Sequence, residues 1–125
     1  MASESTICHF EIPSTDLPAT RAFYRKLFGW TIEPAPHIGE EYLFIRTSAE
    51  QGAVGGGILK RLDAQHGLTL YFTVPDVEAA ARQVVELGGT IVVPRTALPR
   101  TGWSVTARDP QGNMVGLFQA DPSAV

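Results

Sequence analysis

A repeat with an offset of sixty residues constrains the fold of this chain more than any other feature. Residues 9–30 read HFEIPSTDLPATRAFYRKLFGW, and residues 69–89 read TLYFTVPDVEAAARQVVELGG. Each stretch predicts a strand, an acidic helix cap, an amphipathic helix and a closing glycine. The chain is therefore expected to contain two copies of one module, related by a pseudo-twofold axis.

Side chains that alternate along the first strand of each copy divide it into an apolar and a polar face. His9 and Glu11 lie on the polar face in the first copy, and Thr69 and Tyr71 lie on it in the second. The apolar faces are expected to pack against the helices. We therefore expect the four polar side chains to line a shared concavity.

The helix boundaries have clear signals in both copies. Asp16 and Asp76 are the expected N-caps, because a short acidic side chain can accept hydrogen bonds from the free backbone N–H groups of the first turn. Gly29 and the pair Gly88-Gly89 are expected to end the helices.

Three further strands follow each helix, so that each copy reads βαβββ. They are expected at residues 30–33, 42–47 and 54–60 in the first copy and at residues 90–93, 104–108 and 114–119 in the second. Pro94 is expected to end its strand, and residues 95–102 to form a loop. Residues 109–112, DPQG, are typical of a type I turn. Residues 120–125 are expected to fray.

Composition favours one compact domain spanning residues 1–125, made of repeats at about 7–60 and 67–120, because 125 residues with 44% hydrophobic content suit a single core. The sequence has no membrane-length apolar run and no signal-peptide pattern at its start, which favours the cytoplasm. The lone Cys8 agrees with a reducing compartment. A net charge of -3 without a basic stripe argues against nucleic acid as a partner.

Three stretches resemble the vicinal oxygen chelate superfamily, the group of glyoxalases, bleomycin-resistance proteins and extradiol dioxygenases. They are HFEIPSTDLPATRAFYRKLFGWTIE, YFTVPDVEAAARQVVELGG and DPQGNMVGLFQ. The resemblance implies an α+β fold in which two tandem βαβββ modules form a curved eight-stranded mixed sheet around a concave pocket, with the helices outside. More narrowly, the chain is similar to a bacterial branch of glyoxalase-related proteins.

The resemblance also implies where a divalent metal would be held, and this chain departs from that pattern. His9, seven residues before Asp16, matches the first ligand position, whereas Thr69 occupies the second. The two expected glutamates correspond to Gly56 and Gly116. Zinc and octahedral sites need more ligands than one histidine, so no cofactor is predicted.

A divalent metal stays open as an alternative through a different set of ligands. His9 and Glu11 share a face and could act as a two-ligand clip, completed by His37 or His66 from the loops. The other interpretation is that His9 forms hydrogen bonds within a polar pocket.

The glycines in the glutamate positions are expected to open space at the floor of the pocket, since backbone without a side chain allows close approach by a ligand. If the family register holds, Val54, Gly56 and Ile58 line that floor. The same register adds Met114, Gly116 and Phe118, with Trp103 and the loop Arg95 to Arg100 at the rim. The alternative for Ile58, Met114 and Phe118 is an ordinary core position.

Three classes of function are compatible with this pattern. The first is a metal-independent protein that binds a small, partly apolar molecule through His9, Glu11, Thr69 and Tyr71. The second is a glyoxalase-type lyase or isomerase, rather than a dioxygenase, in which Glu11 is the general base and His9 or Tyr71 the acid. The third is a structural or interaction protein with a degenerate pocket. The resemblance also implies a homodimer.

Overall fold

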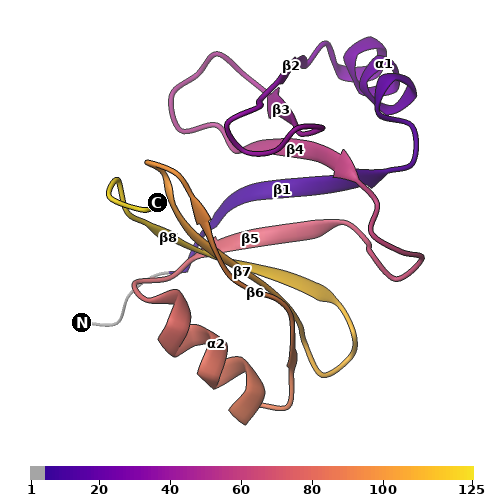
Figure 1. The fold of residues 1–125 in the computed structure, drawn as a ribbon. Coiled ribbons are helices and arrows are strands. Elements are labelled where there is room, and N and C mark those ends of the chain that lie inside the picture. Colours follow the sequence, from indigo (N-terminus) through magenta and orange to yellow (C-terminus); the bar gives the residue numbers. More distant parts are fainter. Residues whose placement is uncertain (1–4) are drawn as a thin grey trace. The chain divides into compact units, whose positions relative to one another are not determined.

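The computed structural model describes residues 5–125, which form two compact units. One unit is His9–Leu68, and the other combines residues 5–8 with Thr69–Val125. The division between Leu68 and Thr69 follows the sequence repeat, so that each unit contains most of one module (Figure 1). The expectation of a single domain stays a prediction.

The first module contains one helix and a four-stranded mixed sheet. Its elements are β1 (Ile7–Ser14), α1 (Leu17–Phe28), β2 (Thr31–Pro34), β3 (Leu43–Arg46) and β4 (Gly55–Lys60). The strand order is β2-β3-β4-β1, in which β3 is antiparallel to both neighbours and β1 is parallel to β4.

The second module repeats the same sequence of elements. These are β5 (Thr69–Thr73), α2 (Val77–Glu86), β6 (Thr90–Leu98), β7 (Gly102–Arg108) and β8 (Met114–Ala120). The strand order is β5-β8-β7-β6, again with one parallel pair, β5 with β8, and antiparallel pairs elsewhere. The predicted α+β class with tandem βαβββ modules and eight strands is confirmed.

Each module has a core of buried aliphatic side chains on the helix side of its strands. Ile32, Ile45 and Ile58 form the first core, with at most 1% of each residue exposed. The second core consists of Val77, Val105 and Leu117. Burial of aliphatic side chains supplies the main stabilising free energy of a small module.

The predicted helix caps are confirmed. Asp16 Oδ1 accepts a hydrogen bond from the Ala19 N–H at 3.0 Å, and Asp76 Oδ1 accepts one from the Glu78 N–H at 2.9 Å. Gly29 ends α1 with a φ of 73°, a left-handed conformation that glycine adopts without steric cost. Neither described helix is long and apolar enough to cross a membrane.

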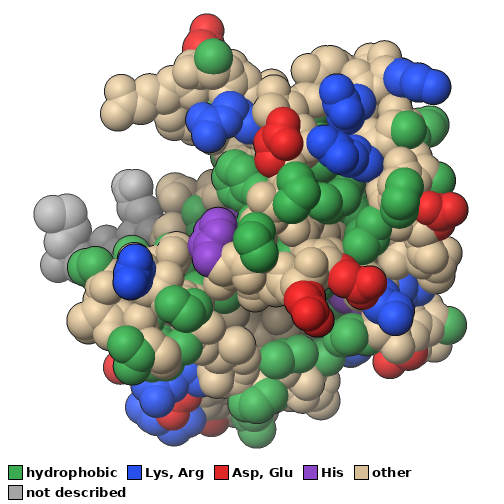
Figure 2. All heavy atoms as spheres, turned by 45° about the horizontal axis from the view of Figure 1, so that its top comes forward, with side chains coloured by type: hydrophobic (Ala, Val, Ile, Leu, Met, Phe, Trp, Pro, Cys, Tyr) green, Lys and Arg blue, Asp and Glu red, His purple; other side chains and the backbone are tan. Residues whose placement is uncertain are grey.

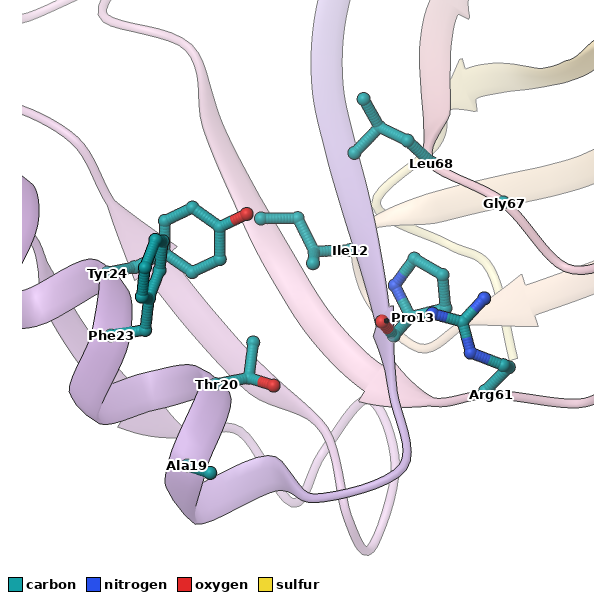
Figure 3. A pocket seen from close by; sticks show the side chains of 9 residues that line it. All are labelled: Ile12, Pro13, Ala19, Thr20, Phe23, Tyr24, Arg61, Gly67 and Leu68. Carbon is teal, nitrogen blue, oxygen red and sulfur yellow. Dashed lines mark hydrogen bonds between the residues drawn. The ribbon is translucent and has the colours of Figure 1, made fainter.

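Helix α1 leaves large apolar side chains at the surface. Phe23, Leu27 and Phe28 are each more than half exposed, and Figure 2 shows hydrophobic side chains at the surface among Lys and Arg side chains. Tyr24 stacks on Trp30 with ring centroids 5.5 Å apart. The exposed side of α1 borders a groove that also touches Ile12 of β1 (Figure 3).

The prediction that Pro94 ends its strand is wrong. Strand β6 continues through Pro94 to Leu98, with irregularities in its pairing to β7 between Ile91 and Thr96. Pro94 lies on the edge strand of its module and within an irregularity of the pairing, two places where the missing N–H of proline is tolerated. The predicted turn at residues 109–112 is confirmed, since the Gly112 N–H donates to the Asp109 carbonyl at 2.9 Å.

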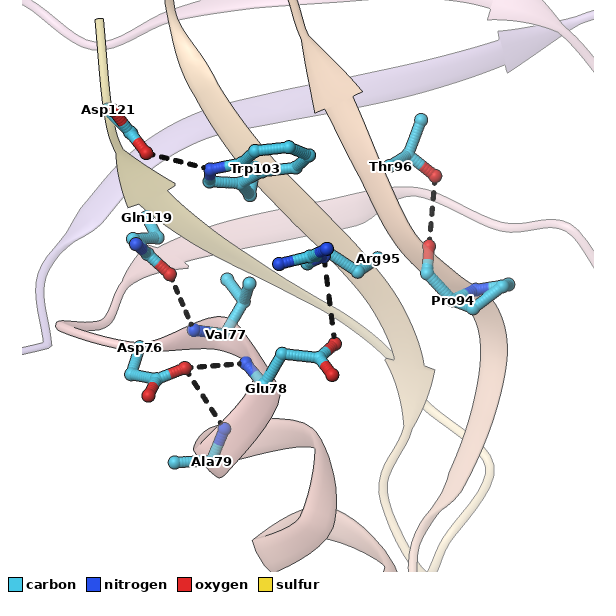
Figure 4. Close-up of polar contacts among 10 residues, drawn as sticks. All are labelled: Asp76, Val77, Glu78, Ala79, Pro94, Arg95, Thr96, Trp103, Gln119 and Asp121. Atoms are coloured by element: carbon cyan, nitrogen blue, oxygen red, sulfur yellow. Dashed lines mark hydrogen bonds and ion pairs between the residues drawn. The ribbon is translucent and has the colours of Figure 1, made fainter. Parts of the chain in front are cut away.

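The prediction of a frayed C-terminus is also wrong. The Asp121 N–H donates to the Thr101 carbonyl at 3.0 Å, and Ala124 is only 1% exposed. The Asp121 carboxylate accepts a hydrogen bond from Trp103 Nε1 at 2.9 Å, as Figure 4 shows. The tail is therefore attached to the turn before β7 by a backbone hydrogen bond and to β7 itself by a side-chain hydrogen bond.

Asp121 is expected to make the stability of this attachment depend on pH. Hydrogen bonds from the Ser123 hydroxyl and then from the Trp103 indole lower the pKa of the Asp121 carboxyl below its usual value. A carboxyl with a lowered pKa in the folded state stabilises the protein above the unfolded pKa, about 3.9, and loses this contribution as the pH falls through the folded pKa. At pH 7 we therefore expect Asp121→Asn to unfold at a lower urea concentration than the wild type.

The difference in urea midpoint between wild type and Asp121→Asn is expected to shrink as the pH is lowered below about 3.9. Glu50→Gln, which removes one carboxylate from an exposed turn, is the matched control for the loss of a negative charge. A difference that is constant over this pH range would contradict the role of the Asp121 carboxylate.

Candidate functional site

Strand β1 presents His9 and Glu11 on the face opposite the first core, as the alternation predicts. Phe10 and Ile12, which alternate with them, pack against the buried isoleucines on the helix side. The side chains of His9 and Glu11 are 24% and 14% exposed. Both groups are thus partly buried without belonging to the apolar core.

Tyr42 connects His9 to Glu11. The Tyr42 hydroxyl donates to Glu11 Oε2 at 2.8 Å, and the same hydroxyl lies 2.6 Å from His9 Nε2. Since the phenolic proton is directed to Glu11, the tyrosine oxygen is the acceptor and His9 Nε2 is the donor. His9 Nε2 is also 3.8 Å from Glu11 Oε2, so the three groups form one compact polar cluster.

The cluster sits beside aromatic rings. The His9 imidazole is nearly parallel to the Tyr42 ring, at an angle of 14° and a centroid distance of 6.4 Å. The Phe44 ring lies 6.5 Å away at 21°. The first module therefore combines a hydrogen-bonding group with flat apolar surface on its non-core face.

Sequence reasoning missed Tyr42 as a site residue. It is 7% exposed and lies just before β3, where its N–H donates to the Gly39 carbonyl and its carbonyl accepts from the Ala35 N–H. One signal was available: Tyr42 and Phe44 alternate with the core residues Leu43 and Ile45, which places both rings on the polar face.

The glycine run in β4 accommodates three aromatic rings. A Cβ at Gly57 would collide with the Tyr42 ring and hydroxyl, and one at Gly55 would lie 3.3 Å from Phe44 Cζ. On the opposite face, a Cβ at Gly56 would lie 2.6 Å from Phe10 Cε2. The expected empty space at these glycines is therefore filled by the protein's own side chains.

This arrangement corrects the predicted face of Gly56 and Ile58. Gly56 faces the Phe10 ring on the helix side, and Ile58 is 0% exposed within the first core. Neither residue lies on the face of His9 and Glu11. Val54, the third residue expected on the pocket floor, is exposed and lies just before β4 begins.

The cause of this error is a difference of one residue between the two modules. In the first module Glu11 pairs with Gly57, whereas in the second module Tyr71, sixty residues after Glu11, pairs with Gly116. The counterpart of Gly116 is therefore Gly57 and not Gly56. Because both positions are glycine, the side-chain carboxylates of the family's metal pattern are absent from both.

In the second module the predicted faces agree with the structure. Tyr71 covers Gly116, and its hydroxyl lies 3.2 Å from Thr106 Oγ1. Met114, Gly116 and Phe118 alternate on β8 with Leu117 of the core, so they lie on the other face. Thr69, only 1% exposed, shares the face of Tyr71.

Trp103 lies away from this face, which corrects its predicted position at a pocket rim. Its ring packs against the second core, and the Arg95 guanidinium lies 4.4 Å from the ring centroid. Arg95 also approaches Glu78 of α2, with 3.9 Å between Nε and Oε1 (Figure 4). Trp103 and Arg95 therefore belong to the helix side of the second module.

The polar side chains present do not fit the family's metal centre. Within residues 5–125, no three His, Cys, Asp or Glu side chains are grouped closely enough to hold a metal ion. His66, one proposed third ligand, is buried, and its Nδ1 accepts the Leu62 N–H at 3.0 Å. His37, the other, lies exposed in the loop before β3.

Comparison with known proteins gives consistent matches over most of the chain. Two curated relatives, from Mycobacterium bovis and Mycobacterium tuberculosis, carry the name "Putative glyoxylase CFP32"; they are 30% identical over 115 residues, which is 89% of this chain and 44% of theirs. The chain thus spans less than half the length of these curated relatives.

Solved structures show the same fold at lower identity. Methylmalonyl-CoA epimerase from Mycobacterium tuberculosis matches with a TM-score of 0.64 and 17% identity, covering 98% of this chain and 94% of the epimerase. A superfamily member from Vibrio splendidus matches with a TM-score of 0.64 and 16% identity, covering 93% and 99%. The family model described as Glyoxalase/Bleomycin resistance protein/Dioxygenase superfamily matches residues 6–117, and the chain belongs to this superfamily.

Proposed function

We propose that this protein binds a small, partly apolar molecule on the non-core face of its first module, without the family's full metal site. The observation that supports this proposal is the Tyr42 hydroxyl that bridges His9 and Glu11 beside the Phe44 ring. A few polar groups that converge next to aromatic surface are the usual composition of a small-molecule site.

The chemistry of the cluster limits the ligand class. The Glu11 carboxylate accepts hydrogen bonds, and the flat rings of His9 and Phe44 offer stacking surface. A planar or aromatic molecule that carries a hydroxyl or amine group matches these features.

Removing the bridge is expected to weaken binding without unfolding the protein. A thermal-shift screen of aromatic and dicarbonyl compounds would first identify a ligand, and calorimetry would then compare variants. Tyr42→Phe deletes a hydrogen-bonding hydroxyl, which is expected to weaken the free energy of binding by about 1 kcal/mol, or about fivefold in Kd. Tyr24→Phe, which removes a hydroxyl on the helix side, is the matched control and is expected to leave Kd unchanged.

Two outcomes would contradict the proposal. If no compound class stabilises the protein, the binding function fails and the structural or interaction class is favoured instead. If the purified protein contains stoichiometric manganese, nickel, zinc or iron, the metal-independent part fails.

Acid–base catalysis is the second candidate function. The chain His9–Tyr42–Glu11 could move a proton between a substrate and Glu11, which would act as general base. The candidates for the acid are His9 and Tyr71, and also Tyr42, whose hydroxyl donates to Glu11 Oε2 at 2.8 Å. A solved structure of similar fold is methylmalonyl-CoA epimerase in complex with methylmalonyl-CoA, so a CoA ester is a reasonable first substrate class. Glu11→Gln should abolish turnover but preserve ligand binding.

We also propose that the protein forms a homodimer, as the family resemblance implies. Sedimentation velocity on the intact chain is expected to give twice the monomer mass. A single monomeric species at all concentrations would contradict this part alone.

A further inference from the structure

A groove of about 580 Å³ lies on the helix side of the first module, between α1 and the end of β1. Figure 3 shows Phe23, Tyr24 and Thr20 of α1 on one side and Ile12 of β1 and Leu68 on the other. Ile12 alternates with Glu11 along β1, so the groove and the His9–Tyr42–Glu11 cluster lie on opposite faces of the strand.

The walls of the groove expose apolar surface to water on both sides. Phe23 is 58% exposed and Leu68 is 61% exposed. Covering apolar surface is favourable by about 25 cal/mol per Å². An apolar group placed between these two side chains would therefore gain binding free energy.

Arg61 supplies the charge at this site. It is the charged side chain among the described residues that line the groove. Its Nη1 donates to the His66 carbonyl at 2.6 Å and its Nη2 lies 3.4 Å from the Pro13 carbonyl. A guanidinium has five N–H donors, and these two contacts orient it while leaving donors for an anion.

Hydroxyl groups add a second kind of polar contact. Thr20 Oγ1 lies 2.7 Å from Ser14 Oγ, which in turn accepts the Asp16 N–H at 2.9 Å. These contacts hold the start of α1 against the end of β1 and hold the Thr20 hydroxyl in place. The groove thus joins an oriented cation, a positioned hydroxyl and two apolar walls.

We propose that this groove is a second binding site, which takes a small amphipathic carboxylic acid. The carboxylate pairs with the Arg61 guanidinium, a charge-assisted contact that suits the planar geometry of both groups. The apolar part lies between Phe23 on one side and Ile12 and Leu68 on the other. The volume falls within the range of about 300 to 1,000 Å³ that is usual for small-molecule sites.

The experiment compares 4-phenylbutyrate with its neutral amide on the intact protein, by calorimetry and by amide chemical shifts. The acid is expected to bind and to shift residues 12–24 and 61–68. Arg61→Gln should weaken binding of the acid by about tenfold or more and leave binding of the amide unchanged. Arg25→Gln, an exposed arginine of α1 outside the groove lining, is the matched control and should change neither.

A second variant separates the apolar contact from the charge. Phe23→Ala removes an exposed ring that the fold does not bury. This variant should weaken binding of the acid and binding of the amide to the same extent. Glu11→Gln and Tyr42→Phe should leave binding of 4-phenylbutyrate unchanged, so failure of the first site would not imply failure of this one.

Three results would overturn the proposal. Equal affinity for acid and amide would exclude recognition by Arg61. Shifts confined to residues around His9 and Tyr42 would place the acid at the other site. The third result is a change of the amide chemical shifts in the groove with protein concentration, in the absence of ligand. If Phe23→Ala abolished both this change and dimerisation, a second copy of the chain would be what covers the groove.

Discussion

Replacing Ile58 by alanine is expected to lower the free energy of unfolding by about 3 to 4 kcal/mol. Ile58 is 0% exposed and packs with Ile32 and Ile45 in the first core. The truncation removes buried apolar surface and leaves a cavity that neighbouring residues can fill only in part. Urea denaturation followed by circular dichroism would measure the change.

Leu62→Ala is the control for this experiment. Leu62 is 66% exposed, so its truncation is expected to change the stability by less than about 0.5 kcal/mol. If Ile58→Ala instead kept full stability and weakened ligand binding, Ile58 would act as the pocket residue that the sequence comparison expected.

The second large effect is expected for Gly57→Val. A Cβ at this position would overlap the Tyr42 ring, which is 7% exposed and has little room to move. Overpacking of this kind costs about 1 to 3 kcal/mol, more than a valine gains from its preference for strands. Displacing the ring would also break the hydrogen bonds to His9 and Glu11, so ligand binding should fall together with stability.

A double variant and a control make this prediction specific. Adding Tyr42→Ala removes the ring that clashes, so Gly57→Val should cost less stability in that background than in the wild type. Gly67→Ala, where a Cβ meets nothing within 4 Å, should be close to neutral. Equal costs for Gly57→Val in both backgrounds would contradict the clash with Tyr42.

Local signals predicted most of the fold correctly. Asp16 and Asp76 were identifiable as caps because their side chains bond to backbone N–H groups only two or three residues away. The turn at residues 109–112 depends on contacts over a similarly short separation. Such features are determined within one or two turns of chain and do not require knowledge of the rest of the fold.

Predictions failed where a distant segment decides the outcome. Strand β6 passes through Pro94 because it is the edge strand of its module and its pairing with β7 is irregular at that point, and both conditions depend on how separate strands are paired. The tail is held by Trp103 and Thr101 through Asp121. Trp103, in turn, faces the helix side because of its register with β8.

The candidate site shows the same difference between residues placed by local patterns and residues placed by contacts between distant segments. Alternation within β1 was enough to place His9 and Glu11 together, because side chains two residues apart share a face. Tyr42, which joins them, is 31 residues from Glu11, and periodicity cannot connect positions so far apart. The ungapped comparison selected Gly56 as the counterpart of Gly116, although pairing between strands identifies Gly57.

The sequence by itself determined the repeated βαβββ order, the helix ends and the two polar residues on β1, because each depends on neighbours along the chain. The tertiary structure alone decided which rings fill the space above the glycines and which tyrosine completes the polar cluster. A one-residue change in strand register moves a side chain to the opposite face, and register is set by pairing between separate segments. For this reason Gly56, which was expected to open a pocket beside His9 and Glu11, lies beneath Phe10 on the opposite face, while Gly57 lies beneath Tyr42.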